Sequence, residues 1–85
     1  MWQIEISSDA GLTLSKLNAE TQKQILADLR NDLLPILEKR KRHKPSLYGS
    51  ADLWWPFLSG DYRLQCRLNE DKKIVSILQI RHLAY

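Results

Sequence analysis

The spacing of apolar residues changes twice along this chain, and these changes limit the folds that it can adopt. Residues 2–7 (WQIEIS) alternate apolar and polar side chains, as a half-buried β-strand does. Between Ile25 and Leu37 the apolar residues recur every three or four positions, which is the apolar stripe of an α-helix. Residues 62–68 (YRLQCRL) return to strict alternation. The chain is therefore expected to form an α+β fold, in which strands and helices occupy separate parts of the sequence.

The first half is predicted to contain one strand and a pair of helices. Trp2, Ile4 and Ile6 are expected to point into the core from the first strand. Residues 8–12 (SDAGL) are interpreted as a turn because they include the turn formers Asp and Gly. A short helical turn is expected at residues 12–17.

The main helix is predicted to begin after Asn18, which suits an N-cap position. Glu20 lies in the first turn, where the helix dipole favours an acidic side chain. Pro35 cannot donate a hydrogen bond to the carbonyl of Asn31, so the helix is expected to kink or restart there. Residues 44–46 (KPS) are expected to end the helix, with a loop following.

The second half is predicted to form a three-stranded antiparallel meander. The strands are expected at residues 53–59, 62–68 and 74–80, with turns at 60–61 and 69–72. Pro56 places the first of these strands at an edge of the sheet or at a bulge, because proline lacks the N–H that a central strand needs. The nearly continuous apolar run of residues 74–80 (IVSILQI) favours a central strand.

The size of the chain, its apolar segments and its cysteine content favour a cytoplasmic protein. The 85 residues are enough for a single domain, residues 1–85. No apolar run approaches the roughly 20 residues of a membrane span, and the first residues lack the pattern of a secretory signal. The single cysteine, Cys66, cannot form an internal disulfide and is interpreted as an inert buried thiol.

Positive charge is concentrated in a few places, although the formal net charge is only +3. Six consecutive basic or titratable residues form the basic run Lys39, Arg40, Lys41, Arg42, His43 and Lys44. Such a run favours a polyanionic partner, whose phosphate backbone it would contact without reading sequence. The alternative is that these are helix-end cations in solvent.

Two groups of polar side chains are candidates for chemistry on a phosphate. Arg63 and Arg67, with Gln65 between them, lie on the polar face of their strand, which is either a phosphate-binding surface or an ordinary solvated face. Arg81, His82 and Tyr85 follow the last predicted strand. Histidine titrates near pH 6.5 and suits proton transfer, and an arginine can stabilise charge that develops on a phosphate. The alternative is a surface terminus with the tyrosine packed on the body.

Other features favour structural roles. Trp54, Trp55 and Phe57 are interpreted as core and strand packing in preference to a base-stacking platform. No metal site is expected, because His43 and His82 are the only histidines and there is no second cysteine. No glycine-rich phosphate loop is present, so no cofactor is expected.

The order of these motifs resembles the RelE/ParE superfamily of bacterial toxins. The resemblance covers essentially the whole chain and is carried best by the segment LYGSADLWWPFLSGDYRLQCRLNEDKKIVSILQIRHLAY. It includes a G-x-Y-R turn at residues 60–63 (GDYR) and an R-x-x-x-Y close at residues 81–85 (RHLAY). A leading strand and a helical hairpin before a three-stranded antiparallel meander are typical of this fold.

The resemblance implies the toxin of a type II toxin–antitoxin module, inhibited by a small acidic antitoxin. Many members are ribosome-dependent mRNA endonucleases. By analogy with them, Arg63 and Arg81 would hold the scissile phosphate, His82 would exchange protons, and Tyr85 would orient the substrate or donate a proton. The basic run and Arg67 would contact RNA.

Two other functions are compatible with the resemblance. The superfamily includes toxins that bind DNA gyrase and are not enzymes, and a degenerate toxin kept only as an antitoxin partner is a third possibility. The sequence also departs from RelE in one strand, which carries lysines in RelE but reads Trp54-Trp55-Pro56-Phe57 here. The general base is therefore unassigned.

Overall fold

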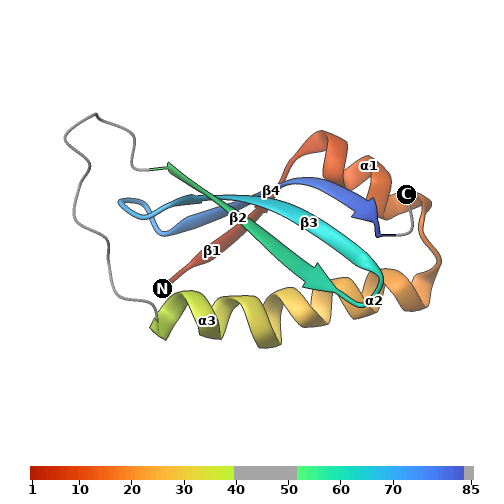
Figure 1. Ribbon diagram of the computed structural model, residues 1–85, viewed down its shortest axis with the longest axis horizontal. Helices are drawn as coiled ribbons and strands as arrows, with labels where there is room; N and C mark the ends of the chain where they lie inside the picture. Colours follow the sequence, from red (N-terminus) through yellow and green to blue (C-terminus); the bar gives the residue numbers. More distant parts are fainter. Residues whose placement is uncertain (40–51, 84–85) are drawn as a thin grey trace.

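The computed structural model describes residues 1–39 and 52–83, and Figure 1 shows a first strand followed by the helices and then by the remaining strands. The elements are β1 (Gln3–Ile6), α1 (Ser8–Lys16), α2 (Ala19–Asp28), a π-helical segment η1 (Leu29–Leu33), α3 (Leu34–Lys39), β2 (Asp52–Ser59), β3 (Tyr62–Asn69) and β4 (Ile74–His82).

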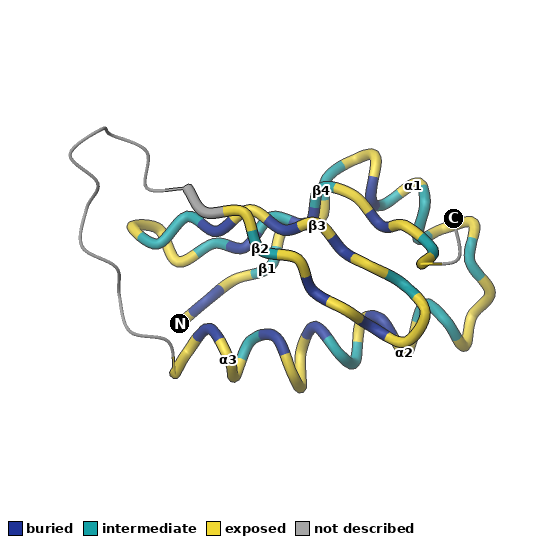
Figure 2. The backbone as a smooth tube through the Cα atoms, viewed as in Figure 1, coloured by how far each residue is buried: buried dark blue, intermediate teal, exposed yellow. Residues whose placement is uncertain are grey.

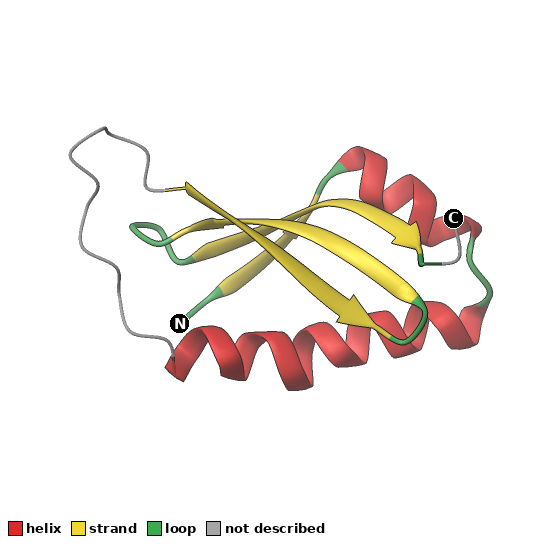
Figure 3. Cartoon of the chain, in the orientation of Figure 1, coloured by secondary structure: helices red, strands yellow, loops and turns green. Residues whose placement is uncertain are grey.

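The four strands form one sheet in the order β1-β4-β3-β2. Strands β2, β3 and β4 pair antiparallel, and β1 pairs parallel with β4. This confirms the predicted α+β class, the meander, the central position of the last strand and the edge position of the strand that contains Pro56. In Figure 3 the long helix formed by α2, η1 and α3 runs beneath the sheet along most of its length.

Strand β4 is longer than the sequence pattern predicts. It extends to His82, so Arg81 and His82 lie within the strand and not after it. The predicted strand of residues 62–68 extends by one residue to Asn69. The preceding turn is formed by residues 60–61, as predicted, with Gly60 at a φ of 56° that suits glycine at the first position of a two-residue hairpin turn.

The prediction of a turn at residues 8–12 is wrong, because this segment lies in helix α1. The Ser7 side chain caps the helix by accepting a hydrogen bond from the Ala10 amide at 3.1 Å. Asp9 lies in the first turn, where an acidic residue is favoured by the helix dipole. Serine and aspartate are therefore signals for the start of a helix here, and Gly11 is tolerated inside it.

The predicted start of the second helix is confirmed. Asn18 accepts a hydrogen bond from the Thr21 amide at 2.8 Å. The expected disturbance at Pro35 takes the form of the π-helical segment η1, in which the Leu34 amide bonds to the Leu29 carbonyl five residues earlier. The wider turn occurs where the proline ring and its missing N–H disturb the α-helical pattern.

The hydrophobic core lies between the helices and one face of the sheet. The long helix contributes Ile25, Leu29, Leu33 and Leu37, and the sheet contributes Leu64, Cys66, Leu68, Val75 and Ile77. Figure 2 shows these buried positions alternating with exposed ones along the strands. No helix of the described segments covers the opposite face of the sheet, which is called the open face below.

One core prediction in β1 is wrong. Trp2 is buried, but Ile6 is 40% exposed. Ile6 is the last residue of an edge strand, and the helical residue that lies against it is Gly11, which has no side chain to cover it. Within the described part of the chain, every helix is too short or too polar to cross a membrane.

Candidate functional site

Strand β3 places three polar side chains on the open face. Arg63, Gln65 and Arg67 are exposed, whereas Leu64, Cys66 and Leu68 between and after them are fully buried. The predicted alternation is confirmed. Because side chains alternate across a strand, the buried positions anchor the register and hold the polar positions toward solvent.

Strand β4 brings Arg81 to the same face. Arg81 is the direct cross-strand partner of Arg63, and Gln79 is the partner of Gln65. Side chains in such pairs have Cβ atoms about 4.5–5.5 Å apart. These four residues line a shallow hollow on the open face. The structure thus brings together two of the predicted site residues that are separated by 18 positions in the sequence.

An extra residue in β4 makes this arrangement possible. Gln65 pairs with Gln79, but the next residue, Cys66, pairs with Ile77, so Leu78 is left over as a β-bulge. Without the bulge, Arg81 would share a sheet face with Ile77, which is in the core. The bulge reverses the alternation after Ile77 and turns Arg81 outward.

Ser7 holds the bulge in place from the start of helix α1. Its hydroxyl donates a hydrogen bond to the Leu78 carbonyl at 3.1 Å, and its backbone amide donates to the Ile77 carbonyl at 2.9 Å. The same hydroxyl accepts from the Ala10 amide. One side chain therefore caps the helix and fixes the strand irregularity that orients Arg81.

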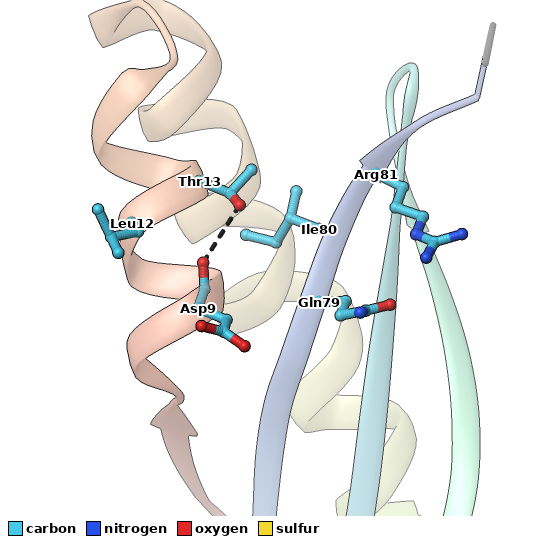
Figure 4. Close-up of a pocket in the computed structure, with 6 residues that line it drawn as sticks. All are labelled: Asp9, Leu12, Thr13, Gln79, Ile80 and Arg81. Carbon is cyan, nitrogen blue, oxygen red and sulfur yellow. Dashed lines mark hydrogen bonds between the residues drawn. The ribbon is translucent and has the colours of Figure 1, made fainter.

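The two sides of β4 differ sharply near its end. Figure 4 shows Ile80 pointing toward α1, whereas Gln79 and Arg81 extend from the other side of the strand. Asp9 and Thr13 belong to the α1 side, where the Thr13 hydroxyl donates to the Asp9 carbonyl at 3.1 Å. Asp9 and Arg81 line the same shallow pocket at the end of β4, but within residues 1–39 and 52–83 no ion pair joins the Asp9 carboxylate to the Arg81 guanidinium.

His82 does not join the two arginines. Its ring packs edge-on against Tyr62, its cross-strand partner, with ring centroids 5.1 Å apart and an interplanar angle of 89°. Tyr62 packs against the hydrophobic core. The predicted grouping of His82 with Arg63 and Arg81 is therefore wrong in its geometry, because consecutive residues of a strand face opposite sides of the sheet.

Several predicted site residues have other positions. Lys39 is exposed at the end of α3, at the far end of the helix from the G-x-Y-R turn. The rest of the basic run and Tyr85 lie outside the described residues. Arg67 lies on the open face in the row of Trp54, its cross-strand partner, and it already takes part in an interaction within the protein.

The electrostatics of Arg63 and Arg81 favour an anion. Among residues 1–39 and 52–83, neither guanidinium forms a hydrogen bond or an ion pair. Two like charges directly opposite each other in a sheet are destabilising, and a phosphate that accepts hydrogen bonds from both would remove that repulsion.

The interior of the sheet contains no comparable reactive group. Burial raises the pKa of the Cys66 thiol to about 12, so it stays protonated. No three acidic, histidine or cysteine side chains of the described segments gather closely enough to hold a metal ion.

Some relevant residues were missed or misjudged from the sequence. The sequence pattern did not indicate a role for Gln79, because it lies in an apolar run. It did not indicate a role for Ser7, because that residue precedes a segment interpreted as a turn. Phe57 is buried as predicted, but Trp54 is 61% exposed on the open face. The interpretation of Trp54 as core packing is therefore wrong. Strict alternation places Trp55 on the same side of the strand as the buried Phe57, and this pattern could have predicted that Trp54 points outward.

The sequence matches no protein-family model and no curated protein. Several solved structures are similar. The toxin–antitoxin complex RelBE2 from Mycobacterium tuberculosis aligns with a TM-score of 0.70 at 22% identity, over 95% of this chain and 96% of that one. The archaeal RelE–RelB complex from Pyrococcus horikoshii aligns with a TM-score of 0.67 at 23% identity, over 96% and 94%.

A third similar structure is the intact RelBE toxin–antitoxin complex from E. coli. It aligns with a TM-score of 0.59 at 19% identity, over 96% of each chain. The chain therefore has the fold of RelE toxins, as the sequence motifs predicted. At these identities the likeness concerns the fold.

Proposed function

We propose that this chain is the toxin of a type II toxin–antitoxin module and that it cleaves mRNA on the ribosome. The observation that carries the proposal is the pairing of Arg63 with Arg81 on the open face of a RelE-like fold. Both side chains are exposed and line the shallow hollow on the open face. Fold alone does not specify function, so the proposal depends on this site.

The two arginines would act on the scissile phosphate. In cleavage by the substrate's own 2′-hydroxyl, the 2′-oxygen bonds to phosphorus and the bond to the 5′-oxygen breaks. Negative charge increases on the phosphate oxygens in the transition state, and two pre-positioned guanidinium groups stabilise that charge. Arginine suits this role because its planar fork of donors matches phosphate oxygens.

Cleavage also needs a group that takes the 2′-hydroxyl proton and a group that protonates the 5′-oxygen. Tyr85 stays the proposed proton donor, and it lies outside the described residues. We do not assign proton transfer to His82, because its ring contacts Tyr62 on the core side of the sheet.

The proposed partners follow from the same features. Two of the similar structures are complexes of a RelE toxin with RelB, and the third is a complete toxin–antitoxin complex. We propose an acidic antitoxin that covers the open face, and ribosomal RNA as the partner of the basic run. These partners imply a cytoplasmic location.

Cleavage of ribosome-bound mRNA tests the proposal. The chain would be purified with its antitoxin, separated from it, and added to ribosomes programmed with a defined mRNA, with the 5′ ends of the products mapped. We expect cuts in ribosome-bound mRNA that disappear with Arg63→Ala and with Arg81→Ala. Arg30→Ala, which removes an exposed arginine from the helix, is the matched control.

Two results would contradict the proposal. Intact mRNA together with gyrase-dependent DNA breaks would mean that the chain is a gyrase-binding toxin. Cleavage that is unchanged by both open-face substitutions would show that the nuclease site lies elsewhere.

A further inference from the structure

An apolar strip runs beside the arginines along the edge of the open face. Strand β2 directs Phe57 and Ser59 into the protein, where they are 8% and 2% exposed. The alternating positions Trp54, Pro56 and Leu58 therefore point outward. Trp54 and Leu58 are each 61% exposed, which is unusual for large apolar side chains.

This apolar strip is in register with the cations of β3. Leu58 pairs with Arg63, and Trp54 pairs with Arg67. Neighbouring strands lie about 4.8 Å apart, so Trp54 and Leu58 each have a cation on the adjacent strand, whereas Pro56 between them lies opposite Gln65. The Trp54–Arg67 row and the Leu58–Arg63 row are four residue positions apart along the strands. At roughly 3.4 Å per residue, this is a distance of about 14 Å.

Two parallel strips of this kind match the two sides of a single-stranded nucleic acid. Its phosphates lie on one side and the flat faces of its unpaired bases on the other. A strand laid along β3 with its phosphates over the arginines would direct its bases over β2. Aromatic rings bind such bases by stacking, with little preference for sequence.

We propose that Trp54 stacks against an unpaired base of single-stranded RNA whose phosphate is held by Arg63 and Arg81. This inference rests on the proposed function and adds a base-binding subsite to it. The subsite lies about two nucleotides or more from the scissile phosphate, because the two rows are separated along the strands. Trp54 is 61% exposed and is therefore accessible to a base.

The binding of a short fluorescent single-stranded RNA, measured at several salt concentrations, tests this subsite. We expect Trp54→Ala to weaken binding about fivefold to 150-fold, which is the range for loss of one stacked base. The dependence on salt should not change, because no phosphate contact is lost. Arg63→Ala should weaken binding and lower the salt slope by about 0.7, as expected for one lost phosphate contact to a single strand.

Two conservative variants separate stacking from simple hydrophobic contact. Trp54→Phe keeps an aromatic ring and should keep most of the affinity, whereas Trp54→Leu keeps an exposed apolar side chain and should bind as weakly as Trp54→Ala. Because Trp54 is exposed, all three variants should keep the thermal stability of the unchanged protein.

The possible failures are distinguishable. If Arg63→Ala lowers the salt slope but every Trp54 variant binds RNA normally, the subsite is wrong and the phosphate site stands. If the unchanged protein does not bind RNA at all, the subsite is overturned, and the cleavage assay on ribosomes decides the proposed function separately. If Trp54→Ala weakens binding of the antitoxin and leaves RNA binding unchanged, the strip is a protein-docking surface and the inference is overturned.

Discussion

Arg63 on β3 and Arg81 on β4 lie directly opposite each other on the open face of the sheet. A cross-strand pair of like charges costs stability in the free protein. The fold therefore keeps a repulsion that a bound anion would relieve by accepting hydrogen bonds from both side chains.

This relationship predicts that Arg81→Ala lowers the rate of RNA cleavage and leaves the stability of the fold nearly unchanged. Removing one of two facing cations should change the free energy of unfolding by no more than about 0.5 kcal/mol, as for most surface substitutions. The loss of one group that stabilises transition-state charge should slow RNA cleavage by about a hundredfold or more. Chemical denaturation and a single-turnover cleavage assay measure the two effects. A large loss of stability would mean that Arg81 has a structural role.

The buried Cys66 predicts a loss of stability at alkaline pH. Its pKa is raised from 9.0 to about 12 by burial, so the unfolded chain releases the thiol proton at a lower pH than the folded chain does. Between these values the folded state binds more protons than the unfolded state, and the free energy of unfolding falls as pH rises. Well below pH 9 the thiol is protonated in both states and contributes no pH dependence.

Denaturation of the unchanged protein and of Cys66→Ala at pH 8 and pH 10.5 measures this contribution. The alanine variant should be less stable at both values because of the cavity, but its stability should decline less between them. An equal decline in both proteins would assign the alkaline loss to other groups.

A third prediction concerns the contact between the β2–β3 hairpin and helix α2. The Ser59 hydroxyl is nearly inaccessible and donates to the Asp28 carboxylate at 2.6 Å, which also accepts from the Gln24 amide at 2.9 Å. Ser59→Ala removes one donor to a charged acceptor and should cost about 1–3 kcal/mol. Ser59→Thr keeps the hydroxyl and provides the comparison in thermal unfolding. If both variants are as stable as the unchanged protein, the hydrogen bond contributes little.

Most of the fold could be predicted because the core positions follow simple periods. The alternation around Leu64, Cys66 and Leu68 fixes which face of β3 is buried, so the outward direction of Arg63 follows from the sequence alone. The stripe from Ile25 to Leu37 similarly fixes the buried side of the long helix. These predictions needed no knowledge of tertiary contacts.

The position of Arg81 could not be predicted in the same way. It depends on the bulge at Leu78, and the run IVSILQI contains no glycine and only two polar residues, Ser76 and Gln79, which do not reveal an extra residue. A regular alternation would have turned Arg81 toward the core. The sequence pattern also ended the strand at residue 80, so it gave no indication that Arg81 and His82 face opposite sides of the sheet.

The contact between Ser7 and the bulge leads to the last prediction. The Ser7 hydroxyl accepts from the Ala10 amide and donates to the Leu78 carbonyl, each at 3.1 Å. Ser7→Asp keeps an acceptor for the helix cap but replaces the hydroxyl hydrogen with a carboxylate that repels the Leu78 carbonyl. Ser7→Thr keeps both functions. We therefore expect Ser7→Asp to weaken RNA binding and Ser7→Thr to preserve it.

Asn18→Ala is the matched control, since it removes a helix cap of similar strength, about 1 kcal/mol, without contacting β4. It should lower the melting temperature and leave RNA affinity unchanged. The NMR signal of the Arg81 side-chain Nε–H provides an independent measure, which should move in Ser7→Asp and stay in place in Asn18→Ala. If Ser7→Asp binds RNA as the unchanged protein does and leaves that signal unmoved, Ser7 acts only as a helix cap, and the bulge orients Arg81 without its help.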